Sequence, residues 1–155
     1  MKLWMDGSSG NVGHAIRATI KGQVENINRQ VMSRGVRVVN ILRNAELEVL
    51  KGQRSGNVYR KPHTKRATYR ASAPGEPPAR RTGNLRLHWN GQVEEGASTK
   101  NGKQILAVLE SQEKYAAVLE EGTKKTTRIE PRPFVDKIKE KAIPEIKKIY
   151  QEPYN

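Results

Sequence analysis

The chain has no cysteine and few large aromatic residues. Its 155 residues include one Phe and two Trp, and hydrophobic residues make up 35% of the total. Without cysteine, neither a disulfide framework nor a thiolate metal site can form, and a small unstapled protein of this kind suits a reducing compartment. The shortage of bulky apolar side chains predicts a modest core. Much of the burial is therefore expected to come from partners.

Long apolar runs are also missing. No segment approaches the ~20 apolar residues that cross a bilayer, and residues 1–13 hold no apolar stretch of signal-peptide length. The sequence therefore predicts a protein without membrane contact, soluble and cytoplasmic when made. Residues 1–13 are rich in Gly, Ser and Asn, which predicts a flexible N-terminal arm ahead of a single domain over residues 14–155.

Positive charge is in large excess and is unevenly distributed. The formal net charge is +13, and between Arg54 and Arg81 eight basic residues stand against the single acid Glu76. Residues 60–82 are predicted to form a long basic, Pro-rich loop, which attracts polyanions in a salt-dependent way. A solvated loop kept soluble by its charge is the alternative. The candidate contacts with DNA or with an acidic neighbour are Arg60, Lys61, Lys65, Arg66, Arg70, Arg80 and Arg81.

Apolar residues recur at helical spacing over residues 14–49, which predicts a long first helix. At 1.5 Å per residue it is on the order of 54 Å long. A compact domain of this size has a diameter of about 40 Å. The helix therefore either bends, for which Gly35 offers a site, or projects and packs on another subunit. Gly52 is the expected stop, and a final helix is predicted to begin at Pro133.

Three segments predict β-strands. Residues 56–60 are a short candidate, residues 84–95 alternate apolar and polar, and residues 104–110 form an apolar run typical of a central strand. A short helix is expected to end at Gly122. The predicted fold class is α+β, with the long N-terminal helix packed on a small antiparallel sheet of three or four strands, a short helix and a C-terminal helix.

No arrangement of residues predicts catalysis. The three histidines, His14, His63 and His88, have no Asp or Glu at metal-ligand spacing, and adjacent acids such as Glu94 and Glu95 point apart. A Gly-rich phosphate cradle is absent as well. The sequence therefore predicts a protein that is not an enzyme and takes no cofactor or metal.

Four short motifs combine Gly and Pro with one or two anchoring residues. They are A-P-G-E-P-P at 73–78, T-G-N-L-R at 82–86, Y-A-A-V-L-E-E-G-T at 115–123 and R-P-F at 132–134. In this order and spacing they resemble the small neck or tail-completion proteins of long-tailed bacteriophages, a family of tail components. On this resemblance, the motif and subunit-interface residues are Pro74, Gly75, Pro77, Thr82, Gly83, Leu85, Tyr115, Ala116, Glu120, Gly122, Thr123, Arg132, Pro133 and Phe134.

The resemblance implies a structural virion protein at the head–tail joint. Such a protein forms a homo-oligomeric ring, six copies matching the tail and twelve matching the connector, around the channel for genomic double-stranded DNA. Its other partners are the head-completion or connector protein and the tail-terminator or tail-tube protein. Glu120 is expected either to pair with Arg132 of the adjoining copy or to be an ordinary surface carboxylate. The competing hypothesis is a free-standing, sequence-independent nucleic-acid-binding protein.

Overall fold

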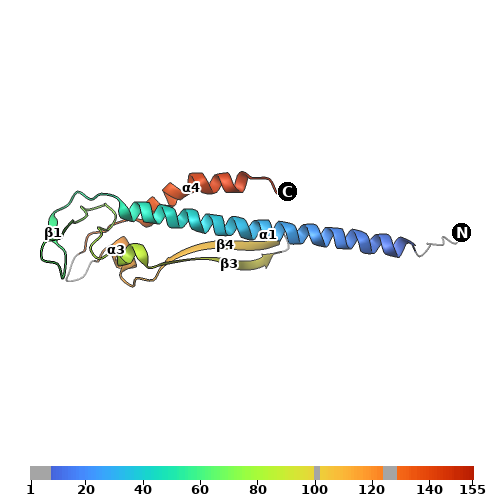
Figure 1. Ribbon diagram of the computed structural model, residues 1–155, viewed down its shortest axis with the longest axis horizontal. Helices are drawn as coiled ribbons and strands as arrows, with labels where there is room; N and C mark the ends of the chain where they lie inside the picture. Colours follow the sequence, from blue (N-terminus) through green and yellow to red (C-terminus); the bar gives the residue numbers. More distant parts are fainter. Residues whose placement is uncertain (1–7, 100–101, 124–128) are drawn as a thin grey trace.

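The computed structural model describes residues 8–99, 102–123 and 129–155, and its fold is α+β, as predicted (Figure 1). One very long helix forms the axis of the molecule, with α4 along one side and a β-ribbon along the other. In chain order the elements are α1 (Ser8–Lys51), β1 (Val58–Arg60), β2 (Thr68–Arg70), α2 (Asn84–Leu87), β3 (Trp89–Thr99), β4 (Gly102–Ser111), α3 (Ala116–Glu121) and α4 (Val135–Gln151).

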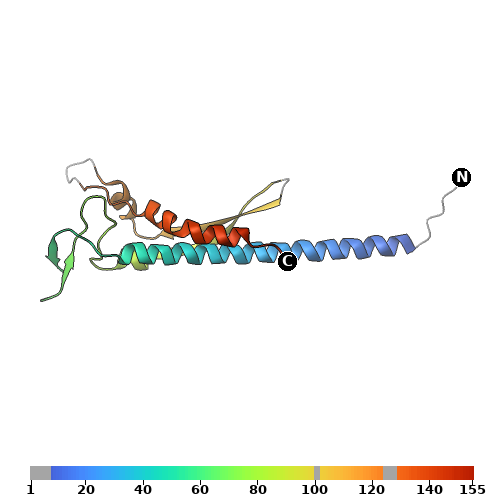
Figure 2. The same ribbon diagram turned by 90° about the horizontal axis from the view of Figure 1, so that it is seen from above.

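Helix α1 is continuous and projects far beyond the rest of the molecule (Figure 2). It begins at Ser8, so residues 8–13, expected in a flexible arm, are helical, while residues 1–7 lie outside the described residues. The helix does not end or break at Gly35. A Cβ there would lie 3.0 Å from Val93 Cγ1 and 3.3 Å from Ile105 Cγ2, so this glycine lets the β-ribbon approach the helix. Of the two expected outcomes, projection is the one observed.

The strands form two separate antiparallel pairs instead of one sheet. β1 pairs with β2, with Tyr59 opposite Tyr69, and β3 pairs with β4, with Trp89 opposite Ser111. β2 lies inside the segment expected to be a loop, which makes residues 58–70 a hairpin. The β1–β2 hairpin exposes about half of the side chains of Val58 and Tyr59, so it has no buried face with which to join the longer ribbon.

The ribbon of β3 and β4 also differs from the expectation in two ways. β4 bonds to one strand within the described residues, and Leu106 is 44% exposed, so this strand is not central. Residues 84–87, expected to start a strand, form the short helix α2, and the indole N–H of Trp89 donates to the carbonyl of Leu85.

The core lies where the C-terminal half of α1 meets α3 and α4. Phe134 is 1% exposed and packs edge-on to Trp89, with ring centroids 6.1 Å apart. Gly52 follows the last residue of α1, as predicted, whereas α4 begins at Val135, two residues after the predicted start at Pro133. The buried apolar side chains of this cluster are Ala45, Leu50, Ala116, Phe134, Ile138 and Ala142.

The C-terminal segment returns to the middle of α1 (Figure 1). The Arg34 guanidinium donates to the backbone oxygens of Glu152 and Pro153, at 2.6 and 2.8 Å, and lies 3.8 Å over the ring of Tyr154. Arg37 forms a forked ion pair with the carboxylate of Glu152. These contacts fasten the chain end to α1 at the point where the helix leaves the body.

Candidate assembly surface

The four motifs meet in space at the C-terminal end of α1. Together with the β1–β2 hairpin they surround a hollow of about 1030 Å³. Its wall includes Pro74 from the Pro-rich segment, Leu85 from the second motif, Tyr115 from the third and Arg132 from the fourth. Pro74 and Arg132, which are 58 positions apart in the sequence, therefore share one site.

The Pro-rich segment is held by hydrogen bonds within the chain. The Glu76 carboxylate accepts from the amide and hydroxyl of Ser55, at 3.0 and 2.6 Å, and from the amide of Ala73 at 2.9 Å. The Ser55 hydroxyl and these amides lower the pKa of Glu76 to about 2. Arg54 donates to the carbonyl oxygens of Val49 and Pro78, which joins the end of α1 to the same segment. The segment is thus ordered in the single chain.

Arg132 and Lys137 hold the other side of the Pro-rich segment. The Arg132 guanidinium donates to the hydroxyl and the carbonyl oxygen of Ser72, which is buried. Lys137 Nζ donates to the carbonyl oxygen of Gly75 at 2.8 Å. Arg132 of the fourth motif therefore anchors the residue just before the first motif, and Lys137 anchors Gly75 within it.

Glu120 has a role that the sequence did not indicate. Its Oε2 accepts hydrogen bonds from the backbone amides of Phe134 and Val135, at 2.8 and 3.2 Å, and so caps the start of α4. Arg132 bonds to Ser72 of the same chain, and its pairing with Glu120 of an adjoining copy stays a prediction. A plain surface carboxylate, the alternative, does not account for the two bonds to α4.

The glycines of the motifs mark sharp changes of chain direction. Gly75, Gly83 and Gly122 have φ values of 77°, 101° and 73°, a region that other residues rarely adopt. At Gly122 an added Cβ would lie 2.5 Å from the carbonyl oxygen of Ile129. Gly122 also ends α3, as predicted, and Thr123 pairs with Ile129 beyond it. The third motif therefore fixes the direction in which the chain leaves α3.

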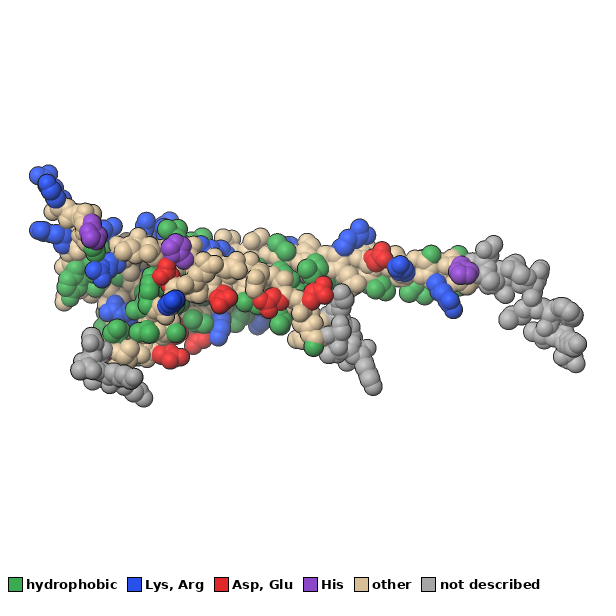
Figure 3. Space-filling model, turned by 90° about the horizontal axis from the view of Figure 1, so that it is seen from below, with side chains coloured by type: hydrophobic (Ala, Val, Ile, Leu, Met, Phe, Trp, Pro, Cys, Tyr) green, Lys and Arg blue, Asp and Glu red, His purple; other side chains and the backbone are tan. Residues whose placement is uncertain are grey.

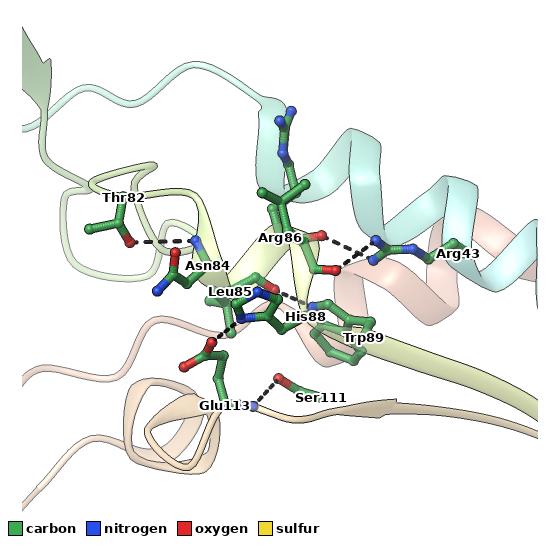
Figure 4. Close-up of polar contacts among 10 residues, drawn as sticks. Arg43, Thr82, Asn84, Leu85, Arg86, His88, Trp89, Ser111 and Glu113 are labelled. Carbon is green, nitrogen blue, oxygen red and sulfur yellow. Dashed lines mark hydrogen bonds and ion pairs between the residues drawn. The ribbon is translucent and has the colours of Figure 1, made fainter.

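The second motif packs against α1 through α2 (Figure 4). The Asn84 amide contacts the Thr82 hydroxyl at 3.4 Å, and Arg43 donates to the carbonyl oxygens of Arg86 and Leu87. On the other side of α2, His88 lies 2.5 Å from a carboxylate oxygen of Glu113. Leu85 packs against the core, so this motif connects the hollow to the body of the protein.

A buried carboxylate lies where Arg43 of α1 contacts α2. Glu46 is fully buried, and it forms an ion pair with Arg43. Burial raises the pKa of Glu46 to about 7, against the opposing effect of Arg43. Among the described residues, Glu46 Oε1 and Arg86 Nε have no hydrogen-bond partner. Sequence reasoning missed this site because Glu46 looks like one of many helix-surface acids.

The basic residues gather at the end of the molecule that carries the motifs. The hairpin bears Arg60, Lys61, Lys65, Arg66 and Arg70, and Arg80 and Arg81 line the hollow. All except the partly buried Lys61 are exposed. Figure 3 shows basic side chains projecting at this tip, whereas acidic side chains lie along the middle of the same face. The predicted basic surface is thus a protruding hairpin in place of an irregular loop.

At the opposite end, the N-terminal half of α1 exposes apolar side chains. The most exposed are Val12, Ile16, Ile20, Val24 and Ile27, between 43% and 58%. The sequence already contained this signal, because the helical spacing of residues 14–49 is longer than one core can cover. We call residues 12–31 of α1 the overhang.

Neither a metal site nor a membrane span is found in the part of the chain that the structure describes. No three His, Asp or Glu side chains of the described ranges group to hold a metal ion, and no described helix is long and apolar enough to cross a bilayer. Comparison with protein-family models, with curated proteins and with solved structures found no match to this chain.

Proposed function

We propose that this chain is a structural protein of the head–tail joint of a long-tailed bacteriophage, where copies form a ring around the DNA channel and help to join the capsid connector to the tail. The proposal draws on the resemblance of the four motifs. One structural observation carries it furthest: the motif residues build an internally bonded end from which a basic hairpin protrudes, while the other end of α1 exposes an uncovered apolar stripe.

These two surfaces differ in chemistry. The overhang presents apolar side chains that are about half exposed, whereas the hairpin presents five basic residues. In a ring whose copies are related by rotation, each subunit contacts its two neighbours through two different surfaces. A protein that acted alone would gain nothing from leaving the apolar stripe in water. The shape therefore favours an assembly component.

The basic hairpin is assigned to contact with DNA in the channel or with an acidic neighbouring ring. Its aromatic residues, Tyr59 and Tyr69, pack on each other with centroids 6.0 Å apart. Scattered positive charges attract a phosphate backbone in a sequence-independent way. This suits a passage through which a genome moves.

The decisive experiment is assembly of phage particles lacking this chain. The expected result is DNA-filled heads and separate tails, which join when the purified protein is added. Negative-stain images of the purified protein should show rings with a central hole. Normal yields of infectious particles without the chain would exclude the proposal.

The competing function, a free-standing nucleic-acid-binding protein, has the basic hairpin in its favour. It predicts salt-dependent binding of the isolated chain to duplex DNA near physiological salt, with slopes of about 0.9 per phosphate contact. It also predicts no rings at high concentration. Neutralising Lys65 and Arg66 to Gln should then weaken DNA binding, while neutralising Lys147 and Lys148 on α4 should not.

A further inference from the structure

The overhang carries one continuous apolar stripe. With about 100° of rotation per residue, Val12, Ile16, Ile20, Val24, Ile27 and Val31 fall within an arc of about 120°. Five of the six are exposed by 43% or more, and Val31 is partly buried. Twenty residues at 1.5 Å each make the stripe about 30 Å long. Nothing among the described residues covers most of this length.

The stripe continues the line of the core. The same rotation places Val38, Leu42 and Ala45 on the same side of α1, and there Val38 and Ala45 are 4% and 5% exposed, between α4 and the ribbon. One helix face is thus covered in its C-terminal half and bare in its N-terminal half. The overhang lacks the layer that α4 and the ribbon provide elsewhere.

The two flanks of the stripe differ in charge. Beyond one edge of the stripe lie the exposed Arg17 and Lys21; along the other edge lie the uncharged Thr19, Gln23 and Asn26, of which Asn26 donates to the backbone oxygen of Asn155. Glu25 is 4.0 Å from Lys21 but lies further round the helix, away from the stripe. The overhang therefore has a basic flank and an amide flank.

We propose that the missing layer is the overhang of neighbouring copies, lying parallel and in register, with the basic flank of each copy against the amide flank of the next. An antiparallel pair would bring the same flank of both copies together and set Arg17 and Lys21 against their own counterparts. A parallel arrangement brings unlike flanks together, so like charges do not meet. The stripe matches itself in length and in chemistry.

This inference rests on the proposed function, because repeated contact of unlike flanks by rotation closes a ring. It goes further by naming which surfaces meet and in which direction the helices run. It also fails separately: a chain can be needed at the head–tail joint even if its overhangs do not touch.

The absence of native cysteine makes disulfide mapping direct. In the full-length protein, Lys21→Cys and Gln23→Cys lie on opposite flanks about 3 Å apart along the axis. The double variant, oxidised under native conditions at high protein concentration, should give a ladder of bands beyond the dimer on non-reducing gels. Each single variant should remain monomeric on the same gels.

Three results would overturn the inference. Disulfide dimers of Lys21→Cys alone would show an antiparallel pair. Bands of the double variant that stop at the dimer would show a closed pair, and monomers in every case would show no contact between overhangs.

A second measurement uses sedimentation velocity. Ile20→Asp should weaken self-association by about tenfold or more, whereas Ala18→Asp, on the opposite face, should leave it unchanged.

Discussion

The Glu120 carboxylate accepts a hydrogen bond from the backbone amide of Phe134 at 2.8 Å, across 14 residues of sequence. The same oxygen accepts from Val135, so one side chain satisfies two amides at the start of α4. Phe134 is also the most buried aromatic residue of the core. This bond thus fixes α4 in position where the hollow and the core meet.

We expect Glu120→Ala to destabilise the protein by about 1 kcal/mol, because α4 loses its N-terminal acceptor. The loss should appear in urea unfolding followed by circular dichroism as a lower midpoint with an unchanged slope. Glu121→Ala is the matched control, since its side chain is exposed on the same helix. Equal midpoints for the two variants would contradict the capping role.

Gly122→Ala and Gly22→Ala should have opposite effects. At position 122 the methyl group would meet a carbonyl oxygen at 2.5 Å in a backbone conformation with φ of 73°, so we expect a loss of more than about 1 kcal/mol. Gly22 lies inside α1 with nothing within 4 Å of an added Cβ, so alanine should raise stability by up to about 1 kcal/mol. Thermal melts of the two variants test this pair, and a shift in the same direction for both would refute the assignment.

The Pro-rich segment should loosen in acid. The pKa of Glu76 is about 2 in the folded protein against 4.5 for an unperturbed glutamate, so the contribution of this carboxylate to stability is complete above pH 4.5 and is lost as the pH falls toward 2. Protection of the Ser55 and Ala73 amides against hydrogen exchange should fall over this range. Glu76→Gln should show the loss already at pH 6, and unchanged protection in that variant would argue against the carboxylate as the anchor.

Glu46 should produce the reverse pH dependence. Its pKa is raised from 4.5 to about 7, so the folded state binds the extra proton, and stability should fall as the pH rises between these values. We expect a loss on the order of 3 kcal/mol between pH 4.5 and 8. Denaturant titrations of Glu46→Gln should show a flatter pH profile. Glu48→Gln, an exposed change on the same helix, should keep the native slope.

The helices could be predicted because their signal is local. Apolar spacing located α1 and α4, and Gly52 and Gly122 marked helix ends correctly. The clustering of the motifs and their hydrogen bonds could not be read from sequence, because they join distant segments. Arg132 and Ser72, for example, are 60 residues apart.

The predicted strand segments overlap β1, β3 and β4, whereas β2, the start of β3 and the division into two sheets were missed for physical reasons. β1 and β2 are three residues each, too short to show alternation, and their pairing depends on a seven-residue connection. Over residues 84–87 the alternation of Leu85 and Leu87 was misleading, since Gly83 turns the chain into a helix and Leu87 is 56% exposed. The buried Glu46 depends on α2 covering it, which no local pattern reveals.

Because α1 is one uninterrupted helix, its number of residues determines its length. Every residue adds about 1.5 Å, so the number of residues between Ser8 and the bonds of Asn26 and Gln30 to Asn155 sets how far α1 reaches past the C-terminal segment. Adding or removing whole turns would change this span without rotating one end relative to the other. The number of residues in α1 therefore sets how far each subunit extends along the helix axis.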